Sequence, residues 1–181
     1  MDSNSAVARL RDATRASHDA VDAAFGGYDL SNRDDYRRFL GAHARALPAA
    51  EQALGALAFA RTLPPRTPLL EQDLADLGEQ MPGSLSFACA DEAALWGALY
   101  VVEGSRLGGV MLSRSVGSDL PHRYLAAAHG PGQWRAIRDA IDAAGRDAST
   151  EWYDALLNGA AATFDLYAQA ARVGEPALAP V

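Results

Sequence analysis

The chain has 181 residues, 49% of them hydrophobic and 22% charged, and its 16 arginines and 23 acidic residues give a formal net charge of -7 at pH 7. This composition excludes a disordered or collagen-like chain and fits one globular domain, and the negative charge disfavours nucleic acid as a partner. The sequence has no apolar leader and no run of ~18 apolar residues, so we expect no membrane span and a cytoplasmic protein.

Composition and periodicity together predict an all-α protein. The chain contains 39 Ala and 22 Leu against 8 Val and 2 Ile. Ala and Leu lose little side-chain freedom in a helix, whereas the β-branched residues that favour strands are scarce. The predicted helices are 5–25, 31–57, 67–77, 91–116, 133–144 and 150–171. We expect them to form one domain over residues 1–173, followed by a disordered tail at 174–181.

The first predicted helix places a histidine on its inward-facing stripe. Apolar residues recur at helical spacing before and after Thr14 and His18, and Gly26-Gly27 ends the helix. A neutral imidazole at His18 could coordinate a metal through one nitrogen, whereas a hydrogen-bonded core histidine is the more common outcome for such a residue. From this residue alone, both interpretations stay open.

Boundary signals define the next two helices. Ser31, with Asp34 three residues later, has the pattern of a capping box and predicts the start of the second helix. Pro48 predicts a kink or an interruption, because proline lacks a backbone donor and crowds the preceding turn. His43 has helical spacing to its apolar neighbours and is expected to pack in the core. Thr67-Pro68 predicts the cap and first turn of the third helix.

The predicted helix 91–116 contains four glycines, Gly97, Gly104, Gly108 and Gly109. An interior glycine costs about 0.5 to 1 kcal/mol relative to alanine, so the missing side chains must bring a compensating gain. Either another helix packs closely against this one, or a flat ligand approaches its backbone at a local bend. Combined with an axial imidazole from the first helix, the second possibility would form a slot for a planar macrocycle.

Several reaction classes lack their motif. The sequence contains no HExxH, GxSxG or Walker A pattern, no Glu-x-x-His pair of a di-iron bundle, and no Cys/His cluster for structural zinc. The single cysteine, Cys89, cannot form an internal disulfide and is expected to be a small buried hydrophobe. His122 and His129 fall in a segment that is predicted to be a loop, and we expect both to face water.

Three arginines are candidates for binding ligand carboxylates. Arg11 lies one to two turns before His18, and Arg135 and Arg138 lie on the helix that Trp134 opens. A guanidinium group can bind a carboxylate through its forked donors. A solvated surface arginine is the competing interpretation for each of them.

The segments LRDATRASHDAVD and YVVEGSRLGGVMLSRSV resemble the heme oxygenase family, in particular the bacterial branch that supplies biliverdin to phytochromes. The resemblance covers most of the chain. It implies a single-domain helical bundle with heme between an N-terminal proximal helix and a kinked, glycine-rich distal helix. It also implies oxidative cleavage of heme b by O2 to biliverdin, carbon monoxide and ferrous iron, with electrons from a ferredoxin or a reductase and a phytochrome as possible acceptor of biliverdin.

The resemblance further implies roles for individual residues near the heme. His18 would be the proximal ligand of the heme iron. Gly104 and Gly108 would let the distal helix bend over the heme face, and Gly109 would assist this approach. Ser105 stands where animal enzymes have an aspartate that organises distal water, so the chain departs from that pattern.

Other residues would form the rest of the heme pocket. Arg11 lies where the family commonly places a basic residue for a heme propionate, and Arg135 and Arg138 lie in a region that supplies others. Phe164 and Tyr167, on the last helix, would line the pocket.

Two other functions compete with this interpretation. A heme carrier or sensor on the same scaffold, suggested by Ser105, would bind heme without opening the ring. A thiaminase-like protein of related helical architecture would require a catalytic cysteine in an acidic pocket, whereas Cys89 falls in a predicted loop without supporting carboxylates nearby. A globin is disfavoured, because its axial histidine would follow several helices.

Overall fold

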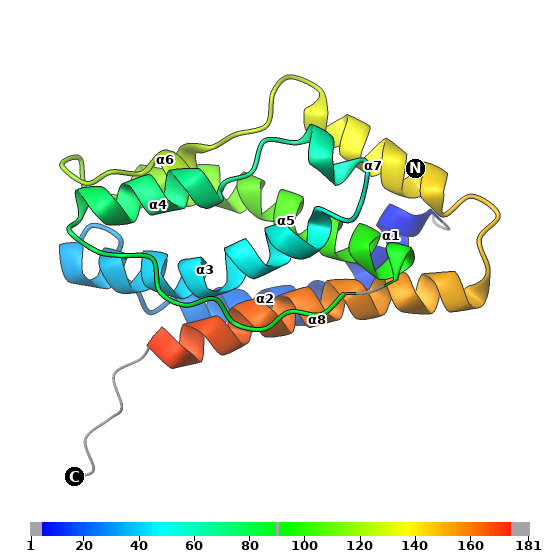
Figure 1. Cartoon of the computed structure of the whole chain (residues 1–181), viewed down its shortest axis with the longest axis horizontal. Helices are drawn as coiled ribbons and strands as arrows, with labels where there is room; N and C mark the ends of the chain where they lie inside the picture. The colour runs from blue at the N-terminus through cyan, green and yellow to red at the C-terminus, as the bar shows by residue number, and fades with distance from the viewer. Residues whose placement is uncertain (1–4, 90, 175–181) are drawn as a thin grey trace, which may run out of the picture.

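The structure, a computed structural model, describes residues 5–89 and 91–174. These residues form helices and connecting segments without a β-strand, which confirms the all-α prediction (Figure 1). The elements are α1 (Ala6–Ala13), α2 (Arg15–Phe25), α3 (Arg33–Leu54), η1 (Ala60–Thr62), α4 (Thr67–Asp76), α5 (Glu92–Leu112), η2 (Ser113–Ser115), α6 (Arg123–Ala126), α7 (Gln133–Ala144) and α8 (Thr150–Gly174). The disordered tail was expected at 174–181; α8 includes Gly174, and 175–181 lie outside the described residues.

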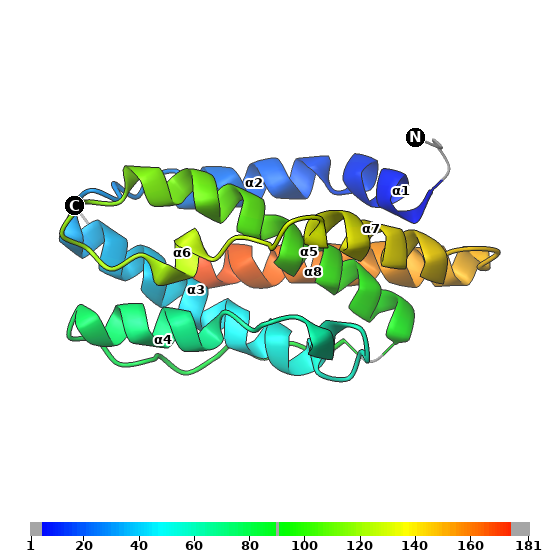
Figure 2. The ribbon, with the colours of Figure 1, turned by 90° about the horizontal axis from the view of Figure 1, so that it is seen from above.

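The helices form a bundle in which α5 is the diagonal element. Figure 2 shows α1 and α2 along one side and α4 along the other, with α8 between them and α5 crossing over α8. Because α5 is apolar on most of its surface, it is stable only when neighbours cover it on several sides. Its buried residues accordingly include both ends and the middle of the helix. Among the described helices, none combines the length and apolarity needed to cross a bilayer.

Two glycines bring α5 and α8 into backbone contact. A Cβ atom on Gly97 would overlap the carbonyl oxygen of Leu156, and a Cβ on Gly159 would overlap the carbonyl oxygen of Ala94. Neither carbonyl can move away, because each belongs to the backbone of a packed helix. Close helix packing therefore explains Gly97, and the crossing point of the two helices is fixed there.

The first predicted helix is divided into two. Thr14 separates α1 from α2 with backbone angles of φ -94° and ψ 1°. Its hydroxyl donates to the carbonyl oxygen of Leu10 at 2.7 Å, and its own carbonyl accepts from the backbone N–H of His18 at 2.9 Å. Such local bonding by threonine competes with regular helix geometry, and periodicity alone does not reveal it.

The start of α3 lies one residue later than predicted. Asn32 caps the helix, because its side chain accepts from the backbone N–H groups of Asp34 and Asp35 at 3.0 and 3.1 Å. The hydroxyl of Ser31 instead donates to Asp29 at 2.7 Å. The capping box was therefore a wrong prediction, although asparagine satisfies the same unpaired donors.

Other predicted boundaries are also corrected. The helix α3 runs without a break through Pro48, so the predicted interruption is wrong, while the alternative outcome, a kink, stays a prediction. Packing of α3 on α8 and α4 outweighs the one backbone hydrogen bond that proline removes. The helix predicted at 91–116 ends as an α-helix at Leu112. The short helix α6 was not predicted, because a helix of four residues is too short to show a helical period in the sequence. The bounds of α7 are confirmed.

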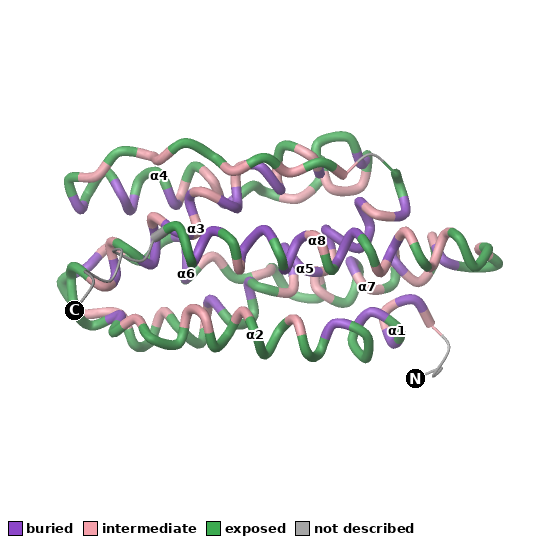
Figure 3. The backbone as a smooth tube through the Cα atoms, turned by 90° about the horizontal axis from the view of Figure 1, so that it is seen from below, coloured by how far each residue is buried: buried purple, intermediate pink, exposed green. Residues whose placement is uncertain are grey.

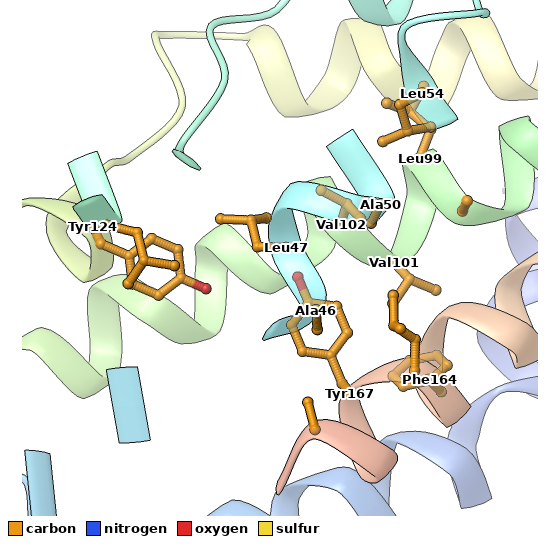
Figure 4. Packing of buried hydrophobic residues seen from close by; sticks show 14 of the residues in the cluster. Ala46, Leu47, Ala50, Leu54, Leu99, Val101, Val102, Tyr124, Phe164 and Tyr167 are labelled. Atoms are coloured by element: carbon orange, nitrogen blue, oxygen red, sulfur yellow. The ribbon is translucent and has the colours of Figure 1, made fainter. Parts of the chain in front are cut away.

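Burial is uneven across the bundle, as Figure 3 shows. The core lies between α3, α5 and α8, where aromatic and aliphatic side chains such as Leu47, Val102 and Tyr167 pack together (Figure 4). By contrast, α2 has no buried residue. Its apolar residues Val21 and Phe25 pack against the edge of the core only in part, and both also line the candidate site.

Candidate functional site

A largely apolar cavity of about 520 Å³ lies between α2, α5 and α8, on the α2 side of the crossing. Its size is typical of a site for a small molecule or cofactor. The residues that sequence analysis singled out and that line it are Arg11, His18, Gly104, Ser105, Gly108, Gly109, Phe164 and Tyr167. Arg135 and Arg138 do not line it.

His18 faces the cavity and is oriented by a carboxylate one turn further along α2. Its Nδ1 atom lies 3.2 Å from Oδ2 of Asp22, and its side chain is 61% exposed. Metal-ligating histidines commonly have a carboxylate beside one ring nitrogen, and Asp22 beside Nδ1 leaves Nε2 as the ring nitrogen that could contact a ligand. The interpretation of His18 as a buried core residue is wrong. Asp22 was missed, although its i+4 spacing was a signal in the sequence.

The glycines of α5 divide between packing and the cavity. A Cβ on Gly108 would meet no atom within 4 Å, and one on Gly104 would lie 3.6 Å from Cη2 of Trp134. Protein packing therefore does not require glycine at either position. A Cβ on Gly109 would lie 3.1 Å from the carbonyl oxygen of Leu125, so this glycine both lines the cavity and lets α6 approach α5.

Aromatic residues and one histidine close the inner end of the cavity. His43 lies between Phe25 and Phe39, with ring centroids 4.4 and 4.2 Å apart, and its Nδ1 donates to the carbonyl oxygen of Phe39 at 3.0 Å. Burial lowers the pKa of His43 to about 4, and the charge of Arg66 acts in the same direction. The predicted packing role of His43 is confirmed. Its place on the cavity lining was missed.

The hydroxyl groups at this end are held in different ways. The Tyr167 hydroxyl is buried without a hydrogen-bond partner, and burial raises its pKa. Ser105 donates to the carbonyl oxygen of Val102 at 2.7 Å and accepts from Nη2 of Arg66 at 2.9 Å. Arg66 is only 2% exposed and also donates to Val102 at 2.7 Å. It fixes Ser105 in place, and no local pattern in the sequence indicated it.

The other end of the cavity carries positive charge. Arg11 and Arg15 line the cavity near its mouth, both exposed, and each is paired with Asp12 at 3.4 and 3.6 Å. Tyr100 lines the same end. Burial raises the pKa of its hydroxyl, while the positive charges of Arg11 and Arg138 oppose this rise. Asp19 and Asp22 also line the cavity, so the positive charge is local to the guanidinium groups, which could contact a ligand carboxylate.

The two other predicted arginines differ from each other. Arg138 is half-buried, acts electrostatically on Tyr100, and has an Nε atom that is buried without a hydrogen-bond partner. Arg135 is exposed on the same helix. Arg138 thus lies near the charged end of the cavity, whereas no contact of Arg135 with the described residues connects it to the cavity.

Three remaining predictions concern residues outside the cavity. His129 does not face water, because its side chain is 6% exposed and its Nε2 lies 3.0 Å from Oε2 of Glu103. His122 is exposed, as predicted. Cys89 is half-buried and does not line the cavity, and burial together with the charge of Asp91 raises its pKa. An activated thiolate needs the opposite shift, which removes support for thiaminase-like chemistry.

Comparisons with known proteins identify the architecture. A crystal structure of NO- and CO-bound heme oxygenase from Neisseria meningitidis superimposes with a TM-score of 0.80 at 24% sequence identity, covering 94% of this chain and 92% of that one. The chain therefore has the all-α heme oxygenase fold. A heme oxygenase from Xanthomonas campestris pv. campestris (strain 8004) is 34% identical over 83 residues. That segment is 42% of this chain and half the length of the relative. No family model matches the chain.

Proposed function

We propose that this protein is a heme oxygenase, a monooxygenase that cleaves heme b with O2 to biliverdin, carbon monoxide and ferrous iron. One observation carries the proposal: a single cavity joins an imidazole, at His18, to a stretch of α5 where glycines are not needed for packing. The fold and the partial sequence match to a heme oxygenase support it.

The residues of the cavity fit an iron macrocycle. His18, with Asp22 beside its Nδ1, would hold the iron through a ring nitrogen. Gly104 and Gly108 present backbone where any larger side chain would project into the cavity. They offer no second strong ligand, which is the condition for oxygen to bind. When bound, the heme iron would supply the oxygen activation.

The charged end of the cavity would bind the carboxylates of the substrate. Arg11 and Arg15 lie at the mouth, and Tyr100 offers a hydroxyl beside them. Arg138 has an unpartnered donor in the same region. Guanidinium groups are the usual partners of carboxylates, so this end would fix the direction in which the macrocycle enters.

Ser105 would organise water on the α5 side of the cavity. Arg66 donates to its oxygen and Val102 accepts its proton, so its hydroxyl has a fixed direction. A second lone pair of that oxygen stays available to accept from water. Electrons would come from an external donor such as a ferredoxin or a reductase in the cytoplasm, and a phytochrome would accept the biliverdin.

Hemin titration followed by aerobic reduction tests the proposal. We expect a Soret band with the spectrum of a single histidine ligand, and conversion to biliverdin when a reductant and oxygen are added. His18→Ala should lose that ligation, whereas His122→Ala, an exposed histidine outside the cavity, should retain it. Unchanged ligation in His18→Ala would refute its role. Stable oxygenated heme without ring opening would indicate a carrier or sensor instead.

A further inference from the structure

A buried ionic network lies beside the cavity, on residues of α5 that do not line it. The carboxylate of Glu103 accepts from Nε and Nη2 of Arg106 at 2.7 and 3.2 Å and from Nε2 of His129 at 3.0 Å. We call these three residues the Glu103 network. Their side chains are between 4 and 6% exposed. Because desolvation of buried charges offsets much of their attraction, such a network is weak evidence for stability alone.

The Glu103 network ties three separate segments together. Arg106 donates to the carbonyl oxygen of Pro64, in the segment before α4, at 2.5 Å. His129 belongs to the segment between α6 and α7, which turns at Gly132 with φ +76°. The backbone hydrogen bonds of this segment close local turns, such as the one from the Gln133 N–H to the carbonyl oxygen of Gly130. The bond from His129 to Glu103 ties the segment to α5 through side chains.

His129 also connects this network to the cavity wall. Its ring stacks on Trp134, with centroids 5.6 Å apart and planes inclined by 21°. Trp134 lines the cavity, and its Cη2 lies 3.6 Å from the position of a Cβ on Gly104. The indole also lies near Tyr100, at 5.9 Å between ring centroids. Trp134 is thus an aromatic wall of the cavity that stacks on His129, a residue that does not itself line the cavity.

We propose that His129 is a positioning residue: the Glu103 network holds it against Trp134, and Trp134 in turn determines how heme is seated in the cavity. The proposal rests on the proposed function. A flat ligand beside a fixed indole has fewer in-plane orientations than one beside a mobile indole, because packed aromatic walls resist displacement. The orientation of heme in the cavity would determine which edge of the macrocycle is oxidised, and therefore which biliverdin isomer forms.

Two substitutions separate the bond from the stacking. His129→Phe keeps a flat ring against Trp134 but loses the bond to Glu103, whereas His129→Gln keeps a donor but loses the ring. His122→Phe is the matched control, because this histidine, directly before α6, is exposed and does not line the cavity. Trp134→Phe leaves the Glu103 network intact and changes the wall alone.

The first readout is independent of turnover. In protein labelled with 5-fluorotryptophan, Trp134→Phe assigns the fluorine resonance of that side chain. We expect this resonance to shift or broaden in both His129 variants and to be unchanged in His122→Phe, while the signals of Trp96 and Trp152 stay in place. An unchanged Trp134 resonance in both His129 variants would overturn the positioning role.

The second readout is the isomer ratio of the biliverdin formed. We expect a change of about fivefold in both His129 variants and in Trp134→Phe, the size that loss of one aromatic contact produces, and none in His122→Phe. An unchanged ratio in Trp134→Phe would refute the seating role of the wall, even if a His129 variant failed to fold. If wild-type protein opened no heme, the proposed function would fail. In that case the positioning role of His129 would be tested by the fluorine resonance of Trp134 and by hemin affinity, which would replace the isomer ratio.

Discussion

Substitution of Gly108 by alanine should stabilise the heme-free protein and weaken heme binding. The residue lies in the interior of α5, and a Cβ there would meet no protein atom within 4 Å. Alanine is favoured over glycine in a helix by about 0.5 to 1 kcal/mol, which corresponds to a rise in Tm of about 1 to 4 °C for a chain of this size. The same methyl group would project toward the ligand, and overpacking of this kind costs about 1 to 3 kcal/mol, or roughly tenfold in affinity for each 1.4 kcal/mol.

The assay is differential scanning calorimetry of the heme-free protein combined with hemin titration, and Gly97→Ala is the matched control. There the new Cβ would overlap the carbonyl oxygen of Leu156 and lie 2.8 Å from the backbone nitrogen of Ala160. Because backbone must move, we expect a loss of about 2 to 4 kcal/mol of unfolding free energy. A lower Tm for Gly108→Ala, or unchanged hemin affinity, would refute the assignment of Gly108 to the ligand side.

Three further predictions test the surroundings of the cavity. Asp22→Asn should weaken hemin binding by about tenfold or more, because it weakens the partner of His18; equal affinity in a titration would contradict this. The folded-state pKa of His43, about 4, lies below its usual 6.5, so the unfolded chain binds more protons and stability falls as pH drops from about 6.5 to 4. Urea unfolding across this window should show a loss, absent in His43→Gln, of about 3 kcal/mol at most; parallel curves would disprove it. Arg66→Met should cost about 2 kcal/mol in urea unfolding, since it removes buried bonds to Ser105 and α5, and an unchanged midpoint would refute that role.

Local signals in the sequence were sufficient where a feature depends on its own segment. The periodicity of residues 133–144, followed by glycine, reproduced α7 with its bounds. The spacing of apolar residues around His18 indicated the face that lines the cavity, and Asp22 was within reach of the same argument because i+4 neighbours meet on a helix surface.

Features that depend on distant segments were out of reach. Arg66 bonds to Val102, 36 residues away, and His129 bonds to Glu103, 26 residues away. Their residue types are common in solvated loops, so neither periodicity nor motif spacing separates them from surface residues. Pro48 shows the converse: local sequence allowed the helix to end there, but α3 continues past it and packs against its neighbours.

The glycines of α5 show how one sequence feature can serve two purposes. Gly97 and Gly159 let α5 and α8 touch, so the crossing point is fixed by the absence of two side chains. Gly104 and Gly108 lie two to three turns further along α5, where the lining of the cavity comes from α2 and from Phe164 and Tyr167 on α8. The spacing of these glycines within α5 was compatible with close helix packing and with ligand approach. The way α5 lies against α8 distinguishes the two: Gly97 packs against α8, whereas Gly104 and Gly108 do not and are left for the ligand.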